Sequence, residues 1–378
     1  MRGDLNYMNS AFPYQALEGP SSIIGIGGTP EGIDQNPLYY DFLYDQNFRH
    51  EPVKNLTAHL IQMNHKRYGL KEIDKNVSMA WAFLLESSYN NDFSVQDYTA
   101  VAHLNPRPTS SQFENDRHSP KKILCKVFNA WVHLVHASYS MHQLTDPFLY
   151  DLVNVGREVL AQLSTPIALN FSDARSATLM NREDLVQTGK LYIELLLDMD
   201  HLLGTNRAFT LSPWLESARR LAQKDATGSS QHDCFSPILR NQTDSGCCSR
   251  FFEWNARCQI TTWNPTLSDA DHIPRGPIDY AAKHWSGLIG EYYAKRANIL
   301  LKQALRDQQE GQPLNSTEVE RMFAIHAYEW TTAVQTEKNV TLASSFQSLR
   351  DHRTSSEKTI QTSKEMLKKY SSWFNTCS

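Results

Sequence analysis

The stretch DLVQTGKLYIELLLDMDHLL, residues 184–203, decides the fold class of this chain. Its apolar side chains recur at intervals of three and four residues, and the clearest members of this stripe are Tyr192, Leu195, Leu196, Met199 and Leu203. Such spacing places them on one face of an α-helix, where they can be buried together. The stretch therefore predicts an amphipathic helix that packs into a helical core.

The same helical signal extends over most of the chain on both sides of this stretch. Two polar segments, residues 92–120 and 224–249, are typical of long loops. Elsewhere, apolar residues at helical spacing predict helices over residues 37–48, 53–68, 78–89, 123–139, 149–163, 285–305 and 356–374. The predicted fold is therefore mainly α.

One segment departs from this pattern: IIGIGGTPEGIDQN, residues 23–36. Residues 23–27 are apolar and β-branched, which indicates a short buried strand. Glycines follow, and Asn36-Pro37 then favours a helix start, because asparagine caps helices and proline suits the first helical position. A single strand needs neighbouring strands, so we expect this β-turn-α unit to be the end of a larger sheet.

Glu31, within this segment, allows three interpretations. A phosphate-binding loop is disfavoured, because Pro30 stands where the third glycine would be and has no N–H, and Glu31 would repel a phosphate. The other two stay open. The first is an ordinary turn with a solvated charge. The second is one half of a pair of catalytic carboxylates, since barrel enzymes place such groups at the C-terminal ends of strands.

Aromatic and histidine residues supply further candidates. Residues 259–285 place Trp263 and Tyr280 around a polar loop between predicted helices. Aromatic faces can stack on apolar sugar surfaces, and the same residues would also fit a core or an interface. His133 and His136 lie three residues apart in a predicted helix, with no carboxylate close behind. We interpret them as ordinary helix residues, and the sequence predicts no metal site.

Charge, hydropathy and modification motifs narrow the setting. With 41 acidic and 37 basic residues the net charge is −4, which argues against nucleic acid as a partner. No apolar run is long enough to cross a membrane. Motifs for N-glycosylation favour the secretory pathway, although the N-terminus as written lacks the apolar core of a signal peptide. These motifs begin at Asn55, Asn76, Asn170, Asn241, Asn315 and Asn339.

The cysteines leave two alternatives open. Four of the six lie between residues 234 and 258. In an oxidising compartment this cluster would form one or two disulfides around a loop, and otherwise its members would be free buried thiols.

Several segments resemble one family, in the same order along the chain. GIGGTPEGIDQNPLYYDFLYDQNF, LLESSYN, EWNARCQITTW and PIDYAAKHWSGLIGEYYAKR resemble the alpha-N-acetylglucosaminidases, glycoside hydrolase family 89. The resemblance covers nearly the whole chain. It implies a glycosidase that removes terminal, non-reducing α-linked N-acetylglucosamine, in animals chiefly from heparan sulfate, and works without a metal or an organic cofactor.

The resemblance also implies a domain organisation. Enzymes of this family combine a small α/β domain, a (β/α)8-type barrel and an all-α C-terminal domain that completes the active site. By that resemblance, residues 1–50 are the last βα part of the barrel and residues 51–378 are the large helical domain.

Individual residues match the family as well. Glu31 matches the catalytic nucleophile of the PEGI motif, which would form a covalent glycosyl-enzyme with retention of configuration. Trp263 and Tyr280 match substrate-binding residues that line the sugar pocket. His103, within AVAHLNPRP, is a further pocket candidate.

The main departure from the family concerns the acid/base glutamate, which belongs to an earlier barrel strand, upstream of the residues of this chain. A retaining mechanism needs two carboxyl groups about 5–5.5 Å apart. We therefore expect this chain alone to be inactive, as a truncated lysosomal or secreted enzyme. The alternative is a non-catalytic helical chain that binds sugars or proteins. Whether copies form a homo-oligomer stays open.

Overall fold

The computed structural model describes residues 3–10, 14, 24–25, 27–28, 37–72, 74–90, 99–102, 104, 121–176, 180–225, 247–263, 279, 281–333, 352–375 and 377. The chain divides into two compact units. Unit 1 comprises Met1–Tyr98, Glu114–Leu163 and Lys358–Ser378, and unit 2 comprises Thr99–Phe113 and Ser164–Glu357. Each unit therefore combines segments that are far apart in the sequence.

The prediction of a mainly α-helical fold is confirmed, and the described residues contain no β-strand. The stretch that carried this prediction forms α9 (Arg182–Leu203), and all five residues of its stripe are fully buried. α9 begins where the side chain of Asn181 accepts hydrogen bonds from the N–H groups of Glu183 and Asp184, at 2.7 and 3.3 Å. An asparagine there provides acceptors for N–H groups that have none within the helix.

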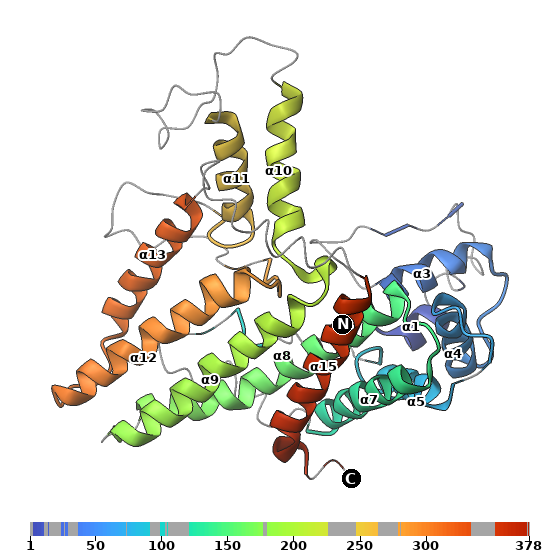
Figure 1. Cartoon of the computed structure of the whole chain (residues 1–378), viewed down its shortest axis with the longest axis horizontal. Helices are drawn as coiled ribbons and strands as arrows, with labels where there is room; N and C mark the ends of the chain where they lie inside the picture. The colour runs from blue at the N-terminus through green and yellow to red at the C-terminus, as the bar shows by residue number, and fades with distance from the viewer. Residues whose placement is uncertain are drawn as a thin grey trace. The chain divides into compact units, whose positions relative to one another are not determined.

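Unit 1 consists of helices that the sequence largely predicted (Figure 1). α4 packs on α5, and α5 packs on α7. In chain order the helices of unit 1 are α1 (Leu5–Ser10), α3 (Pro37–Asp45), α4 (Leu56–Arg67), α5 (Lys75–Leu85), α7 (Lys121–Ser140), the first part of α8 (Asp146–Ser176) and the last part of α15 (His352–Tyr370), with 3-10 turns at Gln46–Phe48 and Ser371–Phe374.

The core of unit 1 is centred on Trp81 of α5 and Trp131 of α7, both fully buried. Trp131 lies against the backbone of α8 at Gly156, where an added Cβ would come within 2.6 Å of the indole ring. Only a glycine allows this close approach, because a contact that short does not occur between real side chains. Tryptophan and glycine are thus matched across two helices.

A buried polar cluster also belongs to unit 1. Asp151 of α8 accepts hydrogen bonds from the guanidinium of Arg67 and, at 2.6 Å, from the hydroxyl of Tyr68. Burial raises the pKa of Asp151 above its ordinary range, although both neighbours favour the charged form. The two donors provide the hydrogen bonds that a carboxylate needs when it leaves water.

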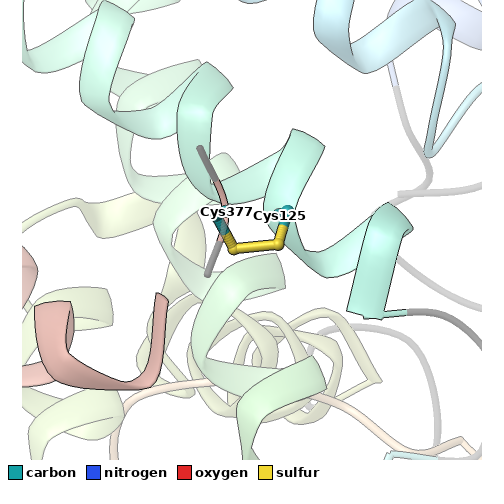
Figure 2. The surroundings of a disulfide bond; sticks show 2 residues. All are labelled: Cys125 and Cys377. Carbon is teal, nitrogen blue, oxygen red and sulfur yellow. A yellow bond between two sulfur atoms is a disulfide. The ribbon is translucent and has the colours of Figure 1, made fainter. Parts of the chain in front are cut away.

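A disulfide between Cys125 and Cys377 joins α7 to the end of the chain (Figure 2). Beside it, Phe128 of α7 stacks on Phe374, with ring centroids 3.8 Å apart. The sequence did not predict this pairing, because the two cysteines are 252 residues apart and no local motif connects them. Of the crowded cysteines at 234–258, Cys258 is a free buried thiol, and burial raises its pKa to about 11.

Unit 2 is built around α9. α9 packs along α12, and α10 packs along α11 (Figure 1). The other helices of unit 2 are the last part of α8, α10 (Ser212–Asp225), α11 (Cys247–Gln259), the π-helix Ile289–Tyr293, α12 (Ala294–Gln309), α13 (Ser316–Thr332) and the first part of α15, with a 3-10 turn at Arg207–Phe209.

The predicted helix over residues 285–305 differs from the observed structure. Residues 282–285 are not helical, and a π-helix at Ile289–Tyr293 precedes α12. The backbone of Ser286 instead pairs with the residues that end and follow the 3-10 turn Arg207–Phe209, donating to Phe209 O at 2.8 Å and accepting from Leu211 N at 3.0 Å. These bonds hold Ser286 in an extended conformation, so the helix begins later than periodicity indicated.

The predicted β-turn-α unit is described only in part. Its helix is α3, whereas Glu31 and its neighbours at 29–36 lie outside the described residues. Ile24, Gly25 and Gly27 are described and are not in a strand, and Ile24 is exposed rather than buried. A strand requires a pairing neighbour, and the described part of the chain contains none. The barrel and the domain boundary at residue 50 stay predictions.

Candidate functional site

Of the four candidate residues, Trp263 lies among the residues that the structure describes. Glu31, His103 and Tyr280 lie outside the described residues, as do most residues of the predicted loop segments at 92–120 and 224–249. The residues on either side of His103 (Ala102 and Leu104) and of Tyr280 (Asp279 and Ala281) are described as well. The site is therefore built from Trp263 and from the backbone that leads to Tyr280 and His103.

Trp263 follows the C-terminal end of α11 and exposes 52% of its surface. Its N–H donates to Cys258 O at 2.7 Å, which closes the last turn after the helix. The backbone has φ = 56°, a left-handed conformation that costs an L-residue about 1–2 kcal/mol. A large aromatic side chain held out in this way can offer a flat face to a ligand.

Two further residues with positive φ lie shortly after residues 264–278, the segment that follows Trp263. They are Asp279, with φ = 57°, and Ala282, with φ = 43°. Among the described residues, the non-glycine positions with positive φ are these two and Trp263. Strained backbone of this kind concentrates at functional sites, because the surrounding structure must hold it in place. The strain therefore marks this region as a candidate site.

Hydrogen bonds join the two ends of this segment. Asp279 N donates to Thr261 O at 2.6 Å, and Ala282 N donates to Asp279 O at 2.8 Å. Thr261 stands two residues before Trp263, and Asp279 stands directly before Tyr280 in the sequence. The backbone leading to both aromatic candidates is thus joined at one point.

An ion pair lies beneath this junction. The guanidinium of Arg296, in α12, donates to the carboxylate of Asp279, and both side chains are buried. Burial alone would lower the pKa of Arg296, but Asp279 and Tyr292 more than offset this and raise it. The guanidinium carbon also lies 5.4 Å from the centre of the Tyr292 ring and 4.7 Å from that of Phe323. The charge is therefore enclosed between a carboxylate and two rings.

A second buried cluster fixes α11, which leads to Trp263. Glu253 is almost fully buried and binds Arg219 at 2.7 Å and Arg257 at 2.9 Å. Arg257 donates in turn to Trp330 O at 3.3 Å and lies 4.7 Å above the indole ring of Trp330. These contacts connect α10, α11 and α13, so the end of α11 has little freedom to move.

A third carboxylate anchors the start of the π-helix. Asp200, near the end of α9, accepts hydrogen bonds from Gly287 N at 2.7 Å and Gly290 N at 2.8 Å. Burial raises the pKa of Asp200, and the two N–H groups partly counteract this. π-Helical turns are frequent at functional sites. This one places Tyr292 against His326, whose Nε2 lies 3.1 Å from Tyr292 O.

The segment before His103 lies in the same region. Thr99 Oγ1 is 3.4 Å from His284 Nε2, and the hydroxyl of Tyr192 donates to Ala100 O at 2.6 Å. His284 follows Tyr280 by four residues in the sequence. The structure therefore places residues 99–100 beside Tyr192 and His284, and all of these belong to unit 2, as does Trp263.

The sequence analysis missed the polar residues that support these segments. Arg296 follows Tyr292 by four residues, so the two side chains lie on the same buried helix face. A charge on a buried helix face requires a partner, and this requirement was the signal that could have revealed Asp279. No comparable signal marks Asp200, because its role depends on the bend at residues 286–290.

Three carboxylates among the described residues of unit 2 already have hydrogen-bond donors. Asp279, Glu253 and Asp200 all already accept hydrogen bonds from arginines or backbone N–H groups. Within the described ranges, no group of three or more histidine, cysteine, aspartate or glutamate side chains could hold a metal ion. None of the helices that the structure describes is long and apolar enough to cross a membrane.

Comparison with known proteins agrees with the resemblance seen in the sequence. Residues 61–369 match the family described as Alpha-N-acetylglucosaminidase (NAGLU) C-terminal domain. The chain is 28% identical to the human Alpha-N-acetylglucosaminidase over 322 residues, which is 84% of this chain and 38% of the human protein. The matching region contains α9, α10, α11, α12 and α13 of unit 2, which include the helix that leads to Trp263 and its buried supports. The chain therefore belongs to the alpha-N-acetylglucosaminidase family through its C-terminal domain.

Proposed function

We propose that this chain is the C-terminal portion of a glycosidase that removes terminal, non-reducing α-linked N-acetylglucosamine, with heparan sulfate as the physiological polymer. The observation that carries the proposal is the exposed Trp263, whose backbone has positive φ and whose segment is hydrogen-bonded to Asp279 through Thr261 O, in a chain of this family. Active sites are where such strain is retained. The chain spans 38% of the length of the human relative that it matches.

In this proposal Glu31 is the nucleophile. Its carboxylate attacks the anomeric carbon, the bond to the leaving oxygen breaks, and a glycosyl-enzyme forms. The leaving oxygen takes a proton from an acid/base glutamate that the resemblance assigns to sequence upstream of this chain. Water, deprotonated by the same residue, then releases the sugar with retained configuration. Without that second carboxyl group, Glu31 supplies half of the mechanism.

Trp263, Tyr280 and His103 bind the sugar in this proposal. Trp263 has the exposure needed for stacking on an apolar sugar face. The buried supports under it, above all the Asp279–Arg296 pair, keep the aromatic residue in place before the substrate arrives. Such preorganisation lowers the entropy that binding must overcome.

The first experiment compares this chain with a form of the native protein that includes the family's upstream region. We expect this chain to release no N-acetylglucosamine from a natural α-linked oligosaccharide, and the longer form to release it. Glu31→Ala in the longer form should abolish turnover, because no other group attacks the anomeric carbon. Turnover by this chain, or an unaffected rate in Glu31→Ala, would contradict the proposed roles.

The second experiment tests the stacking role of Trp263. Trp263→Ala in the longer form should raise KM about 2- to 10-fold, the loss of one aromatic contact of about 0.5–1.5 kcal/mol. Tyr328→Ala is the matched control, because Tyr328 is another exposed aromatic residue of unit 2 and should leave KM unchanged. Equal KM values for the two variants would remove Trp263 from the sugar site.

A second candidate function is a non-catalytic helical chain that binds sugars or proteins. The favouring observation is that Asp200, Glu253 and Asp279 already accept hydrogen bonds, while the aromatic side chain of Trp263 is exposed. Titration calorimetry with an oligosaccharide ending in α-linked N-acetylglucosamine would test it. Binding that requires Trp263, with no turnover by any native form, would favour this function over the glycosidase.

The proposed location is the lysosome or the secretory pathway. The disulfide between Cys125 and Cys377 supports it, because disulfides persist in oxidising compartments and are rare in the cytosol. Exposed glycosylation motifs support it as well. Immunolocalisation of the native protein, together with its oligomeric state in solution, would test this part of the proposal.

A further inference from the structure

Two of the N-glycosylation motifs begin at residues that cap helices. Asn55 is the residue before α4, and Asn315 is the residue before α13. The motifs are Asn55-Leu56-Thr57 and Asn315-Ser316-Thr317, so neither has proline at its middle position. In both, the asparagine and the threonine are exposed. Both sites therefore combine a complete glycosylation motif with a solvent-exposed asparagine and threonine.

The cap leaves the reactive nitrogen of each asparagine unused. Asn55 Oδ1 accepts a hydrogen bond from Ala58 N at 2.9 Å, and Asn315 Oδ1 accepts one from Glu318 N at 3.1 Å. Because an amide carries its oxygen and nitrogen on opposite sides of Cγ, Nδ2 then points away from the helix. Within the described part of the chain, no residue accepts a hydrogen bond from either Nδ2.

An N-linked glycan is compatible with this geometry. The sugar is attached through Nδ2, and the amide keeps its carbonyl oxygen as an acceptor. The helix cap therefore survives the modification. At Asn315 the backbone is fixed as well, because its N–H donates to Asp307 Oδ2 at 2.8 Å. The asparagine is held at its base while the modified atom stays in solvent.

Asn76 provides a contrast within the same chain. It lies inside α5, is half-buried, and its Oδ1 is 3.0 Å from His133 Nδ1 of α7. The ring of His133 stacks in turn on Phe83. The amide of Asn76 thus takes part in the packing of α5 on α7, whereas those of Asn55 and Asn315 face solvent.

We propose that Asn55 and Asn315 carry N-linked glycans in the native protein. In the transfer step, a bond forms between Nδ2 and the anomeric carbon of the first N-acetylglucosamine. The bond from that carbon to the lipid diphosphate of the donor oligosaccharide breaks, and Nδ2 gives up one of its two protons. This inference rests on the proposed location, because the transferase works in the secretory pathway.

The experiment uses the native protein purified from cells that secrete it or deliver it to lysosomes. Peptide-N-glycosidase F in heavy-oxygen water converts each glycan-bearing asparagine to a labelled aspartate, which peptide mass spectrometry then locates. We expect label at positions 55 and 315. An unlabelled asparagine at either position, in a sample labelled at other motifs, overturns the inference for that position.

Matched variants separate the glycan from the cap. Asn55→Asp and Asn315→Asp remove the attachment atom but keep a capping oxygen, since aspartate caps as well as asparagine. Each should lose the mass of one glycan and keep its thermal unfolding midpoint after enzymatic deglycosylation. Asn55→Ala should lose the same mass and also unfold at a lower temperature. Unchanged mass in the aspartate variants would overturn the inference.

Failure of this inference and failure of the proposed activity are distinguishable in the same sample. Turnover of the α-linked oligosaccharide depends on Glu31 and on neither glycan. A protein that is active but unlabelled at every motif overturns the glycosylation inference and its premise of a secretory location. A labelled protein without turnover overturns the glycosidase and leaves the two glycan sites in place.

Discussion

Asp279 and Arg296 form a buried ion pair at the junction between the end of α11 and the backbone that leads to Tyr280. The two residues come from different elements, since Asp279 precedes Tyr280 in a non-helical segment and Arg296 lies in α12. Each charge is removed from water and depends on the other for compensation. The pair therefore couples the stability of unit 2 to the geometry of the candidate site.

Arg296→Met should destabilise the chain by about 3–5 kcal/mol, because it leaves the buried carboxylate of Asp279 without its counter-charge. Guanidinium denaturation followed by circular dichroism measures the change. Lys295→Met is the matched control: Lys295 is the adjacent residue of α12 and pairs with Glu291, and both of those side chains are more than half exposed. Exposed pairs contribute about 0–1 kcal/mol.

The double variant Asp279→Asn with Arg296→Met refines this test. Removing both charges leaves no unpaired ion, so the double variant should be more stable than Arg296→Met alone. A loss in Arg296→Met no larger than that in Lys295→Met would show that the buried pair contributes little. In the longer enzyme, Arg296→Met should raise KM if the Asp279–Arg296 pair holds the sugar-binding residues in place.

His326 of α13 should make unit 2 less stable in acid. Burial lowers the pKa of His326 below its ordinary value of 6.5, although the carbonyl of Tyr292 partly counteracts this. The unfolded chain therefore takes up a proton near its ordinary pKa, while the folded chain takes it up only at lower pH. Between these two pH values the unfolded state binds more protons, so the free energy of unfolding falls as pH falls.

His326→Gln removes this titration and keeps a donor for the carbonyl of Tyr292. We expect the variant to lose less stability than the parent chain between about pH 7 and about pH 5, the range in which histidines titrate. Urea denaturation at both pH values measures the difference. His142→Gln, which makes the same replacement at an exposed histidine, is the control for the substitution itself. Parallel stability curves for His326→Gln and the parent would contradict the assignment.

The helical part of the fold was predictable because periodicity is a local signal. The spacing of Tyr192, Leu196 and Met199 alone places them on one face of α9, whatever the rest of the chain does. Burying that face requires only that other helices pack against it. Starts of helices depend on local patterns as well: Asn315, directly before α13, accepts a hydrogen bond from Glu318 N at 3.1 Å. The side chain of Glu318 binds Arg321.

Contacts between distant segments were not predictable from local patterns. Cys125 and Cys377 are 252 residues apart, and their pairing depends on how α7 meets the chain end. Asp200 supports the π-helix only because the chain bends at Gly287. Of the candidate site, Trp263 stays a prediction from its residue type and its neighbours, while the contacts of Arg296 followed only from the structure. Glu31 stays a prediction from family resemblance.

Loss of the disulfide should destabilise the chain by about 2–5 kcal/mol, the usual range for a native disulfide. The cross-link limits the freedom of the unfolded chain between residues 125 and 377. Cys125→Ser with Cys377→Ser tests this by thermal unfolding, and dithiothreitol should destabilise the parent by a similar amount. Adding dithiothreitol to the double variant is the control and should change nothing. A parent chain that is insensitive to reduction would contradict the pairing.

Gly156→Ala should destabilise unit 1 although it replaces a glycine inside a helix. Alanine is favoured over glycine in helices by roughly 1 kcal/mol. Here, however, the new Cβ would lie 2.6 Å from two ring atoms of Trp131, which is fully buried and cannot move away. Overpacking of this kind costs about 1–3 kcal/mol, so the net change should be a loss, measured by urea denaturation. Trp131→Phe shortens the ring, and combining it with Gly156→Ala should cost less than the sum of the two single changes. Strict additivity, or a gain in stability for Gly156→Ala, would mean that α8 and the tryptophan are not in contact in solution.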